Sequence, residues 1–119
     1  MTIKKPENLI EWLRALPKET EWAEFKVNNS KSDSVGKYVS ALANSAIYNG
    51  EAHGFLVFGI EDGTHNLVGT KVDLASEKVG GESFLHWLNK MLSPSLNIEH
   101  CRHEVDGKFV EILRIDPAY

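Results

Sequence analysis

Apolar residues recur along the chain at two kinds of spacing, one typical of helices and one typical of strands. Steps of three and four residues predict three helices, over residues 9–16, 34–48 and 84–92. The second helix has the most regular apolar stripe, which consists of Val35, Val39, Leu42, Ala43, Ala46 and Ile47. Ser34 is its predicted N-cap, because a serine oxygen can accept a hydrogen bond from a free N–H group of the first turn.

Strict alternation of apolar and polar residues predicts the first strand, over residues 19–27. One face of this strand carries Ala23, Phe25 and Val27, and the other carries Trp22, Glu24 and Lys26. The strand is therefore expected to have one apolar face and one charged face.

Three further runs predict the rest of a sheet. Residues 54–60 are almost all apolar, as expected of a central strand covered on both faces, and residues 67–69 are its short hairpin partner. Residues 98–105 and 108–115 flank Asp106 and Gly107, a pair that favours a tight hairpin turn. The order of elements predicts an α+β fold, with a mixed, mostly antiparallel sheet packed by about three helices.

Length and composition narrow the class of protein. The chain has 119 residues, 42% of them hydrophobic and 25% charged, so residues 1–119 are expected to form a single domain. The sequence stops directly after a predicted strand, which indicates a piece of a longer protein. Its formal net charge of −4 provides no overall basic field, although a local patch can still bind phosphate.

Cysteine content and hydropathy indicate in which cellular compartment the protein is expected. The single cysteine excludes an intrachain disulfide, and no apolar run reaches the roughly 18–20 residues of a membrane-spanning helix. The amino terminus lacks the apolar stretch of a secretory signal. The expected location is the cytoplasm, with no membrane partner.

Four charged residues form the candidate site. Glu24 and Lys26 share a strand face, Glu19 lies just upstream, and Asp62 follows the central strand. If the two strands are neighbours, the three carboxylates converge where Mg²⁺ or Mn²⁺ could be held, with the lysine available for a phosphate. The plainer interpretation, that alternating glutamates are the solvated face of a strand, stays open.

Other motifs offer less. Neither G-x-x-x-x-G-K-[ST] nor G-x-G-x-x-G is present, so no nucleotide phosphate loop is expected. Alternation separates His100 and Arg102 from Cys101 and His103, and no second ligand cluster completes a zinc site. No serine or cysteine at a strand-to-helix elbow supports a hydrolase triad.

The order of several short motifs resembles that of a known family. Residues 19–26 read ETEWAEFK, residues 43–45 read ANS, residues 54–63 read GFLVFGIEDG and residues 67–69 read LVG. Over about residues 19–115 these motifs resemble the Schlafen AlbA-type domain, a family also labelled divergent AAA domain. Each motif is weak alone, and their shared order and spacing make the resemblance fairly specific.

The resemblance implies a domain that binds DNA or RNA and commonly opens a longer bacterial protein of the transcriptional-regulator type. In animal Schlafens, paired copies of the domain form a cleft that cuts structured RNA, and the carboxylates used there match Glu19, Glu24 and Asp62, with a lysine at Lys26. This chain departs from the family pattern over residues 46–53, which lengthen the loop beside the site. It also holds one copy of the domain, so a cleft of that kind would need a homodimer.

Two hypotheses for the function use these residues. The first is a nucleic-acid-binding module, with phosphate contacts from Lys26, Lys31 and Lys37. The second is a metal-dependent endoribonuclease of the Schlafen type, in which the three carboxylates are catalytic residues and metal ligands.

The tryptophans support a third hypothesis, a protein-interaction or dimerisation module. Aromatic residues are enriched in interface cores, and the chain carries Trp12, Trp22 and Trp87. Trp22 falls on the charged face of its predicted strand, which favours exposure. The plainer interpretation is that such tryptophans cover the edges between helices and sheet within one domain.

Overall fold

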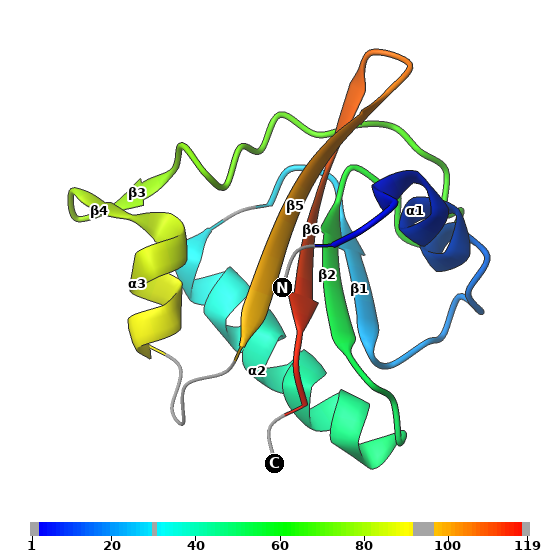
Figure 1. Ribbon diagram of the computed structural model, residues 1–119, viewed down its shortest axis with the longest axis horizontal. Coiled ribbons are helices and arrows are strands. Elements are labelled where there is room, and N and C mark those ends of the chain that lie inside the picture. The colour runs from blue at the N-terminus through cyan, green and yellow to red at the C-terminus, as the bar shows by residue number, and fades with distance from the viewer. Residues whose placement is uncertain (1–2, 30, 92–96, 118–119) are drawn as a thin grey trace.

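The computed structural model describes residues 3–29, 31–91 and 97–117, and a four-stranded sheet forms its centre (Figure 1). The strands are β1 (Ala23–Lys26), β2 (Gly54–Phe58), β5 (Ile98–Val105) and β6 (Lys108–Ile115), in the spatial order β1-β2-β6-β5. β1 and β2 are parallel, and the other neighbours are antiparallel. The predicted α+β fold with a mixed, mostly antiparallel sheet is confirmed.

Helices cover both faces of this sheet and create two apolar cores. The helix α1 (Pro6–Arg14) covers one face, and α2 (Ser32–Tyr48) and α3 (Phe84–Met91) cover the other (Figure 1). All five residues of β2 are buried, because its side chains enter the two cores alternately. The prediction of a central strand covered on both faces is therefore confirmed.

The helix α2 connects the two parallel strands and ends as predicted. The N–H of Gly50 donates to the carbonyl of Ile47 and that of Glu51 to Ala46, at 3.0 and 2.8 Å. This pair of bonds, with Gly50 at φ 67°, is a Schellman motif, which satisfies carbonyls at the helix end. Most of the predicted apolar stripe is buried, and Ile47 is half-buried.

The start of α2 differs from the prediction. Val35 N–H donates to the carbonyl of Lys31 at 2.9 Å, so the first turn already begins at Ser32. Lys31 occupies the N-cap position, and its side chain makes no capping hydrogen bond. The prediction of Ser34 as N-cap is wrong, because Ser34 lies inside the first turn.

β1 is shorter than the predicted strand over residues 19–27. Residues 18–19 and 21–22 form turns, which interrupt the alternation. Trp22 therefore precedes the strand and packs on the α1 side of the sheet, with its ring centroid 5.6 Å from that of Trp12 and 6.2 Å from that of Phe55. The expectation that Trp22 is exposed on the charged face is wrong for this reason.

The β5–β6 hairpin agrees with the sequence pattern. Val105 pairs with Lys108, and both turn residues are left-handed, Asp106 at φ 50° and Gly107 at φ 80°. The partner predicted for the central strand is reduced to one bridge, between Ile60 and Leu67.

The segment before α3 holds elements that the sequence pattern did not predict. The strands β3 (Lys78–Val79) and β4 (Glu82–Ser83) form a small separate hairpin around two glycines. The predicted end of the third helix, at Leu92, lies outside the described residues. Within the described ranges, no helix combines the length and apolar character needed to cross a membrane.

Candidate nucleic-acid interface

The candidate residues lie around one end of the sheet. β1 and β2 are parallel, with Lys26 opposite Phe58, so their carboxyl ends lie at the same edge. β6 runs antiparallel to β2, which brings the turn of the β5–β6 hairpin to this end as well (Figure 1). Residues 27–31 lead from β1 into α2, so the start of α2 is also close to this edge.

Lys26 is the centre of a cluster of charged groups at this end. Its ammonium lies 4.0 Å from the carboxylate of Glu24 and 4.7 Å from the ring centroid of Tyr38 on α2. Hydrogen bonding with the Tyr38 side chain raises the pKa of Lys26; partial burial opposes this, and the negative charges of Glu24 and Asp62 reinforce it. The structure therefore brings Glu24 and Asp62 within electrostatic reach of Lys26, which stays cationic at neutral pH.

Glu19 lies apart from this cluster. It is exposed in a turn before the amino end of β1, whereas Lys26 is the last residue of the strand. Within residues 3–29, 31–91 and 97–117, no group of three or more histidine, cysteine, aspartate or glutamate side chains is placed to hold a metal ion. The three predicted carboxylates do not form a ligand set for Mg²⁺ or Mn²⁺ in this single chain.

The two other predicted lysines lie at the start of α2. Lys31 is at the N-cap and Lys37 is in the second turn, next to Tyr38; both are exposed. Neither ammonium has an ion-pair partner in the described part of the chain. A helix N-terminus favours negative charge, so a lysine at the N-cap does not stabilise the helix. A bound anion, in contrast, would be attracted by both the lysine and the helix dipole.

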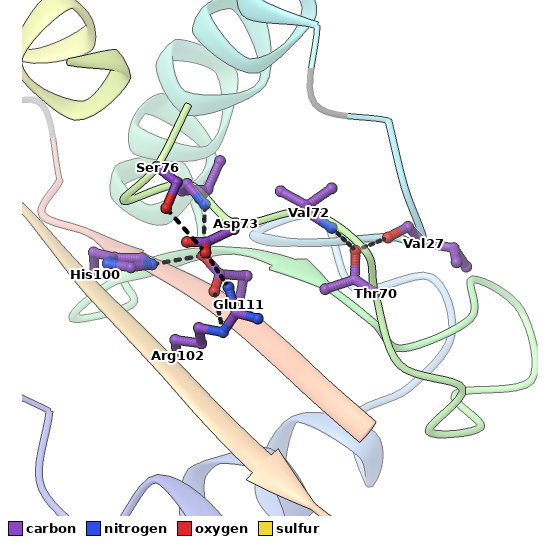
Figure 2. A network of polar contacts seen from close by, with 9 residues as sticks. Val27, Thr70, Val72, Asp73, Ser76, His100, Arg102 and Glu111 are labelled. Atoms are coloured by element: carbon purple, nitrogen blue, oxygen red, sulfur yellow. Dashed lines mark hydrogen bonds and ion pairs between the residues drawn. The ribbon is translucent and has the colours of Figure 1, made fainter. Parts of the chain in front are cut away.

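A buried polar network lies nearby, and the sequence pattern did not predict it (Figure 2). Glu111 on β6 is fully buried. Its Oε1 accepts the Leu74 N–H at 3.1 Å and lies 2.7 Å from Nε2 of His100. Arg102 places its Nε 3.6 Å from the other oxygen of Glu111 and bonds Asp73 at 2.7 Å. The signal in the sequence was a glutamate between apolar residues, with Phe109 and Val110 before it and Ile112 and Leu113 after it.

This network fixes residues 70–76, which we call the crossing segment because they run over the end of the sheet. Partial burial opposes ionisation of Asp73, but hydrogen bonds from Ser76 and the charge of Arg102 outweigh it, so the pKa of Asp73 is below its usual value. At the other end of the segment, the N–H of Thr70 donates to the carbonyl of Phe109 at 2.9 Å. The hydroxyl of Thr70 donates to the carbonyl of Val27 (Figure 2). The crossing segment is thus tied to β6 and to the residue that follows β1.

The alternation predicted for β5 is confirmed. His100 and Arg102 face Glu111, whereas Cys101 packs against the core under α1. Burial raises the pKa of the Cys101 thiol, and the negative charge of Glu111 adds to this effect. The thiolate, which is the nucleophilic form, is therefore disfavoured at neutral pH.

Comparisons with known proteins agree with the fold. The N-terminal domain of an ATP-dependent DNA helicase RecG-related protein from Nitrosomonas europaea is similar, with a TM-score of 0.61 and 24% identity over 98% of this chain and 76% of that one. The DIP2311 protein from Corynebacterium diphtheriae has a TM-score of 0.50 and 19% identity over 96% of this chain, which spans 23% of that protein's chain. No curated protein matches the chain. The family model described as Schlafen, AlbA_2 matches residues 19–119, and the chain therefore belongs to this family.

Proposed function

We propose that this domain binds nucleic acid, DNA or RNA, as a module of a bacterial protein of the transcriptional-regulator type in the cytoplasm. The observation that carries the proposal is the gathering of Lys26, Lys31 and Lys37 around one end of the sheet. Membership of the Schlafen, AlbA_2 family supports this class of ligand, and so does the similarity to a protein named after a DNA helicase.

The charge distribution decides how such binding would work. The chain has a net charge of −4, so long-range attraction of the whole molecule to nucleic acid is unfavourable. Attraction must come from local lysines without acidic partners, and Lys31 and Lys37 meet that condition among the described residues. Binding through phosphate contacts releases counterions, so the affinity is expected to fall steeply as salt rises.

The test is a salt titration of binding to labelled duplex DNA and to a labelled RNA stem-loop, followed by fluorescence anisotropy. The variant Lys31→Gln/Lys37→Gln is compared with Lys4→Gln/Lys18→Gln, two exposed lysines that flank α1 in the sequence. Both double variants have the same net charge. On duplex DNA, the slope of log affinity against log salt should become shallower by about 0.9 for each phosphate contact that is lost.

Each outcome is informative. A shallower slope for the α2 variant alone would support contacts at the start of α2. Equal losses in both variants would mean that only net charge matters, and would contradict the proposed interface. Absence of binding by the wild-type domain at low salt would overturn the function and favour a protein-interaction or dimerisation module.

A second candidate, a metal-dependent endoribonuclease, is favoured by one observation. The ammonium of Lys26 lies 4.0 Å from the Glu24 carboxylate, and the negative charges of Glu24 and Asp62 both raise the pKa of this lysine, so two acidic groups act on one cation. Incubation of structured RNA with the domain and Mg²⁺ or Mn²⁺, and with a chelator, tests this candidate. Cleavage that requires the metal and disappears in Glu24→Ala would establish an enzyme, and no cleavage under any condition would remove the candidate.

A further inference from the structure

An open groove of about 360 Å³ lies at the end of the sheet where the candidate interface is found. Residues 27–28, 68–71 and 107–109 line it, so its walls come from the loop after β1, the start of the crossing segment with the two residues before it, and the β5–β6 turn with the start of β6. None of these residues was singled out by the sequence pattern as a binding residue. The groove is therefore a separate feature from the lysines at the start of α2.

The charge in the groove is positive. Lys71 and Lys108 line it, and none of its lining residues is an aspartate or glutamate. Asp106 is the nearest acidic residue in the sequence and belongs to the exposed turn beside the groove. Neither ammonium has an ion-pair partner in the described part of the chain, although the net charge of the chain is −4.

The three arginines could contact an external anion only by giving up bonds that they make within the chain. Arg14 donates to the His65 carbonyl, Arg102 is held by Asp73, and Arg114 bonds Glu99 at 2.7 Å. Every arginine of the chain thus already has an intramolecular partner. The cations that remain free to bind an external anion are lysines.

Hydrogen bonds between the segments that line the groove hold its walls in a fixed position. Thr70 N–H donates to the Phe109 carbonyl, and Lys71 N–H donates to Oδ1 of Asn28, both at 2.9 Å. Because Oδ1 of Asn28 is used in this way, its side chain offers the amide NH₂, which is a donor, to a ligand. A preformed site with two cations and a neutral donor binds an anion at a smaller entropic cost.

The rim of the groove is shaped for an extended ligand. At Gly107, with φ 80°, an added Cβ would meet no atom within 4 Å, so the rim is open there. Val68 is 41% exposed beside the lysines and gives an apolar contact suited to a sugar ring. An open groove with mixed apolar and cationic walls fits a polymer that passes through better than an enclosed small anion.

We propose that this groove binds a backbone phosphate of the nucleic acid, with Lys71 and Lys108 on the phosphate oxygens and the Asn28 amide as a further donor. The groove extends the path of the backbone from Lys31 across the end of β1 to the β5–β6 turn. This inference rests on the proposed function and adds a second, independent set of contacts to it.

The test compares Lys71→Gln/Lys108→Gln with Lys4→Gln/Lys18→Gln, which has the same net charge, in the same anisotropy titration. Glutamine keeps the Cβ and Cγ atoms of Lys108, which would lie 3.0 and 3.4 Å from a Cβ added at Gly69. We expect the groove variant to bind more weakly, with a salt slope shallower by about 0.9 per lost contact on duplex DNA and about 0.7 on a single strand. Circular dichroism confirms that the variants fold.

The inference and the proposed function fail in different ways. If the α2 variant loses affinity while the groove variant matches the control in affinity and slope, the groove inference is overturned and the function stands. If the wild-type domain binds neither DNA nor RNA, both are overturned. Displacement of the oligonucleotide by inorganic phosphate at constant ionic strength, for the wild type but not for the groove variant, would assign the groove to free phosphate instead.

Discussion

Glu111 shows how one residue can hold a surface segment in place from inside the sheet. Its carboxylate is fully buried, accepts the Leu74 N–H and faces the side chains of His100 and Arg102. Glu111→Ala leaves these groups without their shared partner, so the free energy of unfolding should fall by about 3–5 kcal/mol, as for other broken buried pairs. Urea denaturation measures this loss.

Glu104→Ala is the control for this prediction, because Glu104 is an exposed glutamate on the neighbouring strand β5. Its effect should stay within about 0.5 kcal/mol, as expected of a surface substitution. A similar loss in both variants would contradict the structural role assigned to Glu111.

Lys26 provides a prediction about pH at the scale of one side chain. Because the Tyr38 side chain, Glu24 and Asp62 raise its pKa in the folded state, the interaction stabilises the fold below the ordinary lysine value of 10.5. This stabilisation should be lost as the pH rises through the higher, folded-state pKa. An NMR titration of the Lys26 side chain in wild type and in Tyr38→Phe measures the shift. Tyr38→Phe should lower the pKa, and an unchanged pKa would exclude the hydroxyl as its main cause.

At the scale of elements, the contact between α2 and β2 depends on a glycine. A Cβ added at Gly54 would lie 2.7 Å from the carbonyl oxygen of Leu42, which is backbone and cannot rotate away. Gly54→Ala should therefore push α2 from the sheet and lower the free energy of unfolding by about 1–3 kcal/mol. Gly36→Ala, where an added Cβ meets nothing within 4 Å in the same helix, should raise it by about 0.5–1 kcal/mol. Urea denaturation of both variants gives the signs, and equal signs would contradict this account.

The elements that could be predicted from the sequence are those with a period or turn signal of their own. The β5–β6 hairpin has a two-residue turn signal, and β2 and α2 have long uninterrupted patterns. The crossing segment has neither, because two of the hydrogen bonds that hold it join residues 37 and 43 positions apart in the sequence. Its place over the sheet depends on Glu111, whose burial cannot be read from periodicity.

In the candidate site, too, only the residues that follow from a local pattern could be predicted from the sequence. The proximity of Lys26 and Glu24 follows from the period of two in a strand, and that of Asp62 from the pairing of β1 with β2. Glu19 was placed on the same strand, but the turns over residues 18–22 separate it from the others. The lysines of the groove come from two loops that only the fold brings together, so no local pattern could identify them.

At the scale of the whole molecule, the two cores share one sheet and should unfold together. β6 contributes Val110 and Ile112 to the core under α1, and Leu113 and Ile115 to the core under α2 and α3. Loss of either core would expose one face of β6 and β2, which removes the support of the other core. Domains of this size commonly unfold in a single cooperative transition.

The tryptophans allow this cooperativity to be measured from both sides. Trp12 and Trp22 contact the α1 side of the sheet, and Trp87 packs against the core on the other side. In urea, the fluorescence of Trp87→Phe should report the first side and that of Trp12→Phe/Trp22→Phe the second. Within each variant, the fluorescence and far-UV circular dichroism midpoints should coincide. A Trp87 signal lost at lower urea than the circular dichroism of the same variant would show that α3 and the small β3–β4 hairpin open separately, because they lie outside the shared sheet.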